Sequence, residues 1–475
     1  MQLSRKQLKT LRTAARSGDA GAAASLLAHS VALGHVRLSL RRYFSARALD
    51  APDIARFSSF CGAAARRVEF SELVAMAHEA AQRLAHSSKV HQMVAELLPP
   101  IVPILLPYEG IMPRFETAPQ VCGQGAAVLG KVQIGAGASI GAMAVIRGDG
   151  HFIRIGDNFY LGGGSTVHIA HKLYPTIIGD QVTVGRNAVV HACTVGTHCT
   201  IEDEVVVLDG TIIGENVLVE AGSTVFPRSV LASGFAYAGS PARQVRPLLN
   251  DEVSERASRL REAATAGFSL LGSMPKAPSQ QGTTRRFVAP TARLAGNVVL
   301  GPRSSIFFSC DLDAGDASIV VGQCTNIQDN THIKCTKGGV GIGQDSTIGH
   351  NVMIADCQIG ARTLVGMGSV INNGTIIEDD VFVAAGTITE VGQKLERGWL
   401  WGGRPARPLA KLDSKKRAII VATVEQYCTY ARAYQEAKSQ VRRGGRNGTS
   451  SFTNRDPNGR SRTNRPGLGS QSREG

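Results

Sequence analysis

A six-residue beat of aliphatic side chains is the feature that most constrains the fold of this chain. From about residue 120 the spacing runs through Val128, Ile134, Ile140 and Ile146, pauses at loops, and resumes at Ile178. An α-helix would scatter such positions around its axis, since it has 3.6 residues per turn, and a simple strand needs a period of two. A period of six fits short strands, three to each coil of a parallel β-helix, with every aliphatic side chain pointing inward.

The beat occurs twice. It returns from about residue 290, and residues 178–225 match the second stretch at a constant offset of 164. The Pro-Ala-Arg turn at 241–243 matches the one at 405–407 at the same offset, while residues 128–161 match at 166. The second copy therefore has a loop two residues shorter. We interpret the pattern as a tandem duplication, and call residues 116–272 the first copy and residues 285–441 the second copy.

The fold class predicted is mainly β, with two β-helix prisms and an N-terminal helical region. Each prism ends in an amphipathic α-helix, near 250–272 and 413–440. The predicted organisation is a transit peptide (1–44), a helical region (45–115), the first prism with its helix (116–272), a linker (273–284), the second prism with its helix (285–441), and a basic disordered tail (442–475).

Charge separates the ends of the chain from its centre. The net charge is +14, yet residues 49–441 are neutral, because the basic residues gather at 1–48 and 442–475. A folded surface for nucleic acid is therefore not indicated, although a basic tail can contact an anionic partner. The Arg-rich, acid-poor start is typical of a mitochondrial transit peptide cleaved before Ser45. The alternative is an ordinary soluble helix from Arg5 to Leu27.

The remaining composition limits the class of protein. No run of about 18 apolar residues is present, which excludes a transmembrane helix. The 9 cysteines form no CxxC pair and are odd in number. In a chain of this length they predict free thiols in a reducing compartment.

The two copies resemble the gamma-class carbonic anhydrase family of left-handed β-helix proteins over about 120–272 and 285–440. The resemblance rests on Arg147-Gly148-Asp149, on PTIIGDQVTVGRNAVVHACTVG at 175–196, on Asn326-Ile327-Gln328-Asp329-Asn330 and on STIGHNVMIADCQIG at 346–360. It implies trimers of prisms in which three histidines, two from one prism and the third from its neighbour, bind zinc. Three neutral imidazoles with an open fourth position are the ligand set of a catalytic zinc that activates water to attack carbon dioxide.

Taken copy by copy, both sets of ligands implied by the resemblance are incomplete. The first copy has His168, Arg186 and His191, and arginine stays protonated, so it cannot be a ligand. The second copy has Lys334, His350 and Ala355. His332 competes with Lys334 for the first position, since the shorter loop can be aligned in two ways.

Taken across the copies, one complete set remains. His168 and His191 of the first copy with His350 of the second predict a composite site for one zinc per chain. The opposite pairing has no complete set. The accessory residues that the resemblance implies divide in the same way. Arg147 and Asp149 are kept in the first copy, and Gln328 and Asp329 in the second.

Three functions remain open on the sequence. The first is hydration of carbon dioxide at the composite site. The second is a structural role with relic histidines in a mitochondrial assembly such as the carbonic anhydrase-like domain of respiratory complex I, where a separate third prism subunit completes the trimer. The third is a hexapeptide acyltransferase, which would need a long catalytic loop that the sequence lacks. The expected location is the mitochondrial matrix, or otherwise the cytoplasm.

Overall fold

The computed structural model describes residues 3–65, 68, 76–77, 79–80, 103–267 and 286–444. The predicted linker, most of the predicted tail and much of residues 66–102 lie outside these residues. In the described part, no helix is long and apolar enough to span a bilayer.

The N-terminal residues form short helices around their own core. The helices are α1 (Arg5–Arg16), α2 (Ala20–Ala32), α3 (Val36–Ala48), a 3-10 helix (Ile54–Phe57) and α4 (Ser58–Ala65). Ser4 and Asp19 accept hydrogen bonds from the first turns of α1 and α2, as N-cap residues do. Leu27, Leu40 and Phe44 are fully buried in this core. The predicted cleavage site before Ser45 therefore lies within α3, and cleavage there stays a prediction.

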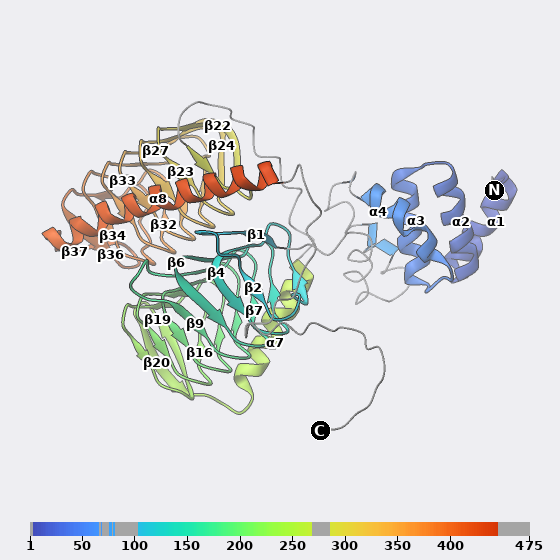
Figure 1. The fold of residues 1–475 in the computed structure, drawn as a ribbon, viewed down its shortest axis with the longest axis horizontal. Coiled ribbons are helices and arrows are strands. Elements are labelled where there is room, and N and C mark those ends of the chain that lie inside the picture. The colour runs from blue at the N-terminus through green and yellow to red at the C-terminus, as the bar shows by residue number, and fades with distance from the viewer. Residues whose placement is uncertain are drawn as a thin grey trace, which may run out of the picture. The chain divides into compact units, whose positions relative to one another are not determined.

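The first copy is a β-helix whose strands stack in parallel from coil to coil (Figure 1). Val128, Ile146, Val167 and Val190 are register partners in successive coils and are 0% exposed. The six-residue beat thus builds the core, as predicted. Its strands are β1 (Ile104–Leu106), β2 (Arg114–Phe115), β3 (Val121–Cys122), β4 (Ala127–Ile134), β5 (Ser139–Ile140), β6 (Val145–Ile155), β7 (Tyr160–Leu161), β8 (Thr166–His168), β9 (Thr176–Ile178), β10 (Thr183–Val184), β11 (Val189–His191), β12 (Thr194–Val195), β13 (Thr200–Ile201), β14 (Val206–Val207), β15 (Ile212–Ile213), β16 (Leu218–Val219), β17 (Thr224–Val225), β18 (Val230–Leu231), β19 (Phe235–Gly239) and β20 (Ala242–Pro247).

The second copy repeats this arrangement, with Ile306, Ile327, Ile348 and Val365 buried in successive coils. Each copy closes on an antiparallel pair, β19–β20 and β36–β37. Its strands are β21 (Phe287–Val288), β22 (Arg293–Leu300), β23 (Ser305–Ile306), β24 (Asp311–Val321), β25 (Asn326–Ile327), β26 (His332–Lys334), β27 (Val340–Ile342), β28 (Thr347–Ile348), β29 (Met353–Ala355), β30 (Cys357–Ile359), β31 (Leu364–Val365), β32 (Val370–Ile371), β33 (Ile376–Ile377), β34 (Phe382–Val383), β35 (Lys394–Leu395), β36 (Trp399–Gly402) and β37 (Arg407–Lys411).

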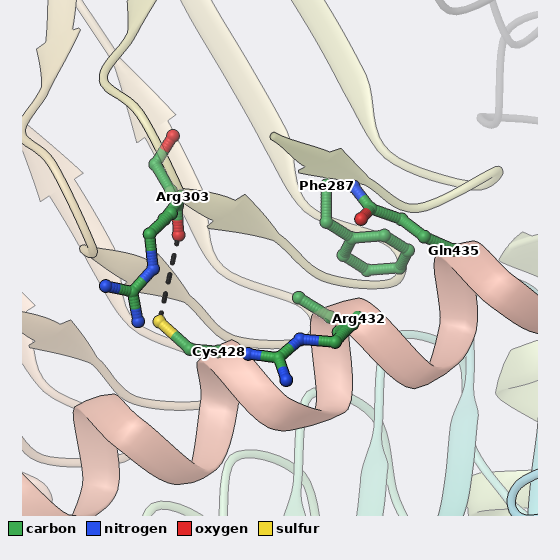
Figure 2. A pocket seen from close by; sticks show the side chains of 7 residues that line it. Phe287, Arg303, Cys428, Arg432 and Gln435 are labelled. Atoms are coloured by element: carbon green, nitrogen blue, oxygen red, sulfur yellow. Dashed lines mark hydrogen bonds between the residues drawn. The ribbon is translucent and has the colours of Figure 1, made fainter. Parts of the chain in front are cut away.

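A helix follows each copy, as predicted. Helix α7 (Glu252–Gly267) packs on the first copy, where Arg261 donates to Thr183. Helix α8 (Ser414–Gly444) runs along the second copy (Figure 1). Figure 2 shows a small pocket beside α8, where Cys428 faces the carbonyl oxygen of Arg303. The histidines predicted to bind zinc are not part of its lining.

The two copies contact each other through a sheet face of the first and the coil corners of the second. Asn351 donates to the Gly164 carbonyl at 2.7 Å, and its amide oxygen accepts from Thr166 Oγ1 at 2.7 Å. Arg404 donates to the Gly222 carbonyl at 2.7 Å. These polar contacts join a sheet face of the first copy to coil corners of the second copy. The equivalent sheet face of the second copy and the equivalent corners of the first copy take no part in them.

Candidate metal centre

Three buried histidines converge where the copies meet. Strand β8 supplies His168 and β11 supplies His191 one coil further on, and the two residues are register partners. His350 comes from a coil corner of the second copy, just after β28. Nδ1 of His168 lies 3.2 Å from Nε2 of His191 and 3.1 Å from Nε2 of His350. The composite grouping predicted from the sequence is thus the one that the fold brings together.

Each histidine has a carboxylate at its outer ring nitrogen. Nε2 of His168 lies 2.8 Å from Asp149 Oδ1, and Nδ1 of His191 lies 2.6 Å from Asp209 Oδ1. Nδ1 of His350 faces Asp329 Oδ2 at 3.2 Å, without the alignment of a hydrogen bond. Carboxylates at these positions keep the proton on the outer nitrogen and turn the inner lone pairs toward one another.

This donor set fits a zinc ion. Ligand nitrogens about 2.0 Å from a tetrahedral zinc lie roughly 3.3 Å apart, close to the separations found here. The potential ligand atoms of the three histidines all lie within 4.8 Å of one another. The converging lone pairs of the inner nitrogens repel one another, and a bound cation satisfies them.

Burial keeps two of the imidazoles neutral. Desolvation lowers the pKa of His350 to about 4, although Asp329 opposes the shift. Desolvation, followed by the charge of Arg147, also lowers the pKa of His168 well below its usual value. Neutral imidazole is the form that binds metals.

The accessory residues predicted from the sequence lie at the same contact between the first and second copies, which we call the seam. Arg147 is fully buried and pairs with Asp149 of its own copy and with Asp329 of the second copy, the latter at 3.0 Å. Burial raises the pKa of Asp149 to about 7, while Arg147 opposes that shift. Burial also acts to raise the pKa of Asp329, but Arg147 and His350 outweigh it and the pKa is lowered. Gln328 is buried beside Asn326, and its Oε1 has no partner among the described residues.

Arg186, Lys334 and Ala355 leave the opposite pairing of the copies without a complete set of histidines, and they do not belong to this cluster. Arg186 is 53% exposed at its side chain and pairs with Asp203. Lys334 pairs in register with Ala355, as His168 does with His191. Lys334, and not His332, therefore occupies the position equivalent to His168, which settles the alignment that the sequence left open.

Sequence reasoning missed two groups of contact residues. Asp209 stands one coil after His191, eighteen residues on, so the coil length could have pointed to it. Three tyrosines of α8 also reach the seam. The Tyr427 hydroxyl lies 3.3 Å from His350 Nε2, the Tyr430 hydroxyl 2.9 Å from His171 Nδ1, and the Tyr434 hydroxyl donates to Asp149 at 3.0 Å. Their spacing on the predicted helix was visible, but not the surface that the helix covers.

Comparison with known proteins agrees with this architecture. A family model described as the hexapeptide repeat of succinyl-transferase matches residues 152–192 and 357–388. A relative in Arabidopsis thaliana, gamma carbonic anhydrase 1, mitochondrial, is 33% identical over 181 residues, which are 37% of this chain and 65% of that protein. The chain thus spans just under two thirds of that relative's length.

Two further matches cover nearly whole proteins. Protein YrdA of Escherichia coli is 34% identical over 155 residues, 31% of this chain and 84% of YrdA. A crystal structure of a hexapeptide transferase family protein from Anaplasma phagocytophilum is 28% identical and covers 35% of this chain and 98% of that one. Its TM-score is 0.31. With the duplicated β-helix and the extended match to YrdA, the chain belongs to the gamma carbonic anhydrase-like family of left-handed β-helix proteins.

Proposed function

We propose that this protein binds one zinc ion at His168, His191 and His350 and hydrates carbon dioxide reversibly there. The observation that carries the proposal is the convergence of three buried imidazoles, each facing a carboxylate, from two copies that are each incomplete. When bound, zinc supplies Lewis acidity that activates water at neutral pH.

The pattern of loss between the copies argues against relic histidines. At each of the three ligand positions, the copy that keeps the histidine also keeps its carboxylate, and the other copy has lost both. The retained pairs are His168 with Asp149, His191 with Asp209 and His350 with Asp329, against Lys334 with Gly315, Ala355 with Asn373 and Arg186 with Gly163. Independent random losses would only occasionally leave all three histidine–carboxylate pairs intact in this arrangement.

The protein groups have separate parts in this proposal. The carboxylates hold the imidazoles with their lone pairs inward. Arg147 balances the charge of Asp149 and Asp329 and ties the copies together. Gln328 is assigned to orienting the bound molecule, because its buried Oε1 is free to accept a hydrogen bond.

Metal content of the purified full-length protein tests the proposal, followed by a carbon dioxide hydration assay. We expect about one zinc per chain and its loss in His350→Ala. His332→Ala is the matched control, since His332 is an exposed histidine of the same copy, and it should keep both zinc and activity. Zinc that survives His350→Ala would show that the copies are not joined by the metal.

A structural role is the second candidate, because the three histidines are at most 6% exposed and α8 covers them. An exposed apolar residue on the second copy also favours binding of a third prism. Val189 and Val206 of the first copy are buried against the second copy, whereas the equivalent Met353 is 57% exposed. A single-prism gamma carbonic anhydrase-like subunit would fill this gap, in a respiratory complex or outside one. Light scattering of an equimolar mixture should then give one 1:1 complex.

A mitochondrial location is part of this proposal. It is supported by the name of the Arabidopsis relative and by the composition of residues 1–48. Fractionation of cells that express the full chain tests it, with a matrix marker as reference. Recovery with cytosolic markers would contradict it.

A further inference from the structure

Helix α8 presents a row of tyrosines to the seam between the copies. Tyr427, Tyr430 and Tyr434 follow the three- and four-residue spacing that aligns side chains on one face of a helix. All three are at most 5% exposed. The T-shaped contact between the rings of Tyr427 and Tyr430 keeps this row closely packed.

The three hydroxyls have different neighbours. Tyr430 contacts His171, and Tyr434 contacts the carboxylate of Asp149. The Tyr427 hydroxyl lies 3.3 Å from Nε2 of His350, which is an inner nitrogen of the histidine cluster. It also accepts a hydrogen bond from Arg147 Nη2 at 3.1 Å. Tyr427 is therefore the tyrosine whose hydroxyl reaches the side of the cluster that a metal would occupy.

The position of this hydroxyl beside His350 indicates its role. The inner nitrogens of His168 and His350 are 3.1 Å apart, and the Tyr427 oxygen stands at nearly the same distance from His350 Nε2. At this distance the Tyr427 hydroxyl can donate its proton to the lone pair of His350 Nε2, which is the lone pair that a metal would take. We propose that Tyr427 covers the inner side of the three-histidine site at His350 and controls which external ligands can bind there. This inference rests on the metal binding proposed above.

Two features make Tyr427 a fixed cover. Arg147 holds the hydroxyl in place, and Arg147 is itself fixed by Asp149 and Asp329. The ring of Tyr427 also packs in a T-shaped contact against Phe307, with centroids 5.0 Å apart. A small anion must displace the hydroxyl from the inner side of the cluster, so Tyr427 is a specificity-determining residue.

Cobalt(II) in place of zinc, with azide as the external ligand, tests this inference. Visible absorption of the cobalt protein reports both the stoichiometry and the coordination number of the metal, independently of activity. Tyr427→Phe removes the oxygen and keeps the ring. We expect it to bind azide roughly tenfold more tightly, the equivalent of about one hydrogen bond. Tyr430→Phe, on the same helix face, should match the unaltered protein.

The outcomes separate this inference from the proposed function. Equal azide affinity in the unaltered protein and in a cobalt-loaded, folded Tyr427→Phe variant overturns the inference alone. Failure of all three folded proteins to bind cobalt overturns both proposals. An equal gain in azide affinity in Tyr430→Phe also overturns the inference about Tyr427. The effect would then come from a change in the helix and not from the Tyr427 hydroxyl.

Discussion

Among the carboxylates that contact the histidines, Asp209 is the most open to solvent. Its side chain is 41% exposed, whereas Asp149 and Asp329 are fully buried in their pairs with Arg147. Burial acts to raise the pKa of Asp209, yet His191 outweighs this effect and the pKa is lowered. Asp209 can therefore be altered with little disturbance of the core.

We expect Asp209→Asn to weaken metal binding about 10–100-fold, as loss of an outer carboxylate does at other sites. The amide keeps the shape but not the charge that faces His191. A competition titration with a chelating dye measures the change. Asn373→Ala is the matched control, because residue 373 is the equivalent position in the second copy, where Ala355 replaces the ligand. Comparable weakening in both variants would remove Asp209 from the site.

Arg147 carries a prediction about stability. Arg147→Met leaves Asp149 and Asp329 buried without their partner, and should lower the free energy of unfolding by about 3–5 kcal/mol. Denaturant titration of the metal-free protein measures this loss. The equivalent residue of the second copy is Asp313, which is partly exposed and paired with Arg293. Asp313→Ala should cost no more than about 1 kcal/mol, and an equal loss in both variants would contradict the central role of Arg147.

The histidines were predictable because the family resemblance implies three ligand positions and the duplication lets one copy be compared with the other at those positions. Asp209 was not, since its contact with His191 is made between coils and not along the chain. The tyrosines of α8 were missed for a related reason. An amphipathic pattern predicts a helix with an apolar face, but it does not identify the surface on which that face lies.

At the scale of the elements, the six-residue beat predicted the β-helices well, since each aliphatic position has an inward partner in the next coil. Helix positions were predicted closely at their start, with α7 beginning at Glu252 and α8 at Ser414. The N-terminal segment was harder, because an acid-poor, Arg-rich composition is shared by targeting peptides and by small helical domains.

The start of α7 gives a prediction on pH. Glu252 forms two hydrogen bonds to Arg246 and accepts one from the Leu249 amide. The bonds to Arg246 lower the pKa of Glu252 to about 2, while burial opposes them. The stabilisation is therefore complete above the usual pKa, near 4.5, and is lost as the pH falls from there toward 2.

Glu252→Gln should lower the free energy of unfolding by about 1 kcal/mol at pH 7. The difference from the unaltered protein should shrink below pH 4.5. Amide exchange in α7, measured at several pH values, checks this. Glu255→Gln, at an exposed position in the same turn, is the control and should change little. A difference that grows on acidification would contradict the sign of the effect.

At the scale of the whole molecule, Gly368 is one position where the backbone of the second copy comes close to the first copy. Its φ of 65° disfavours other residues, and a Cβ there would clash with Val206 of the first copy. Gly368→Ala should separate the copies enough to abolish zinc binding while each β-helix stays folded. Gly392→Ala is matched in conformation, with φ of 71°, but has nothing near its Cβ and should keep the metal. Zinc content and circular dichroism together measure the result.

One polypeptide carries both the sheet face of the first copy and the coil corners of the second copy. The seam between the copies therefore forms by an intramolecular contact. The contact between Asn351 and Gly164 forms at an effective concentration set by the connecting chain and not by the amount of protein present. A metal site shared between separate subunits is lost when the subunits dissociate on dilution. The three-histidine site within this chain should persist at nanomolar protein concentration. Because the two copies are covalently linked, formation of the contact between them does not depend on how much of the protein a cell makes.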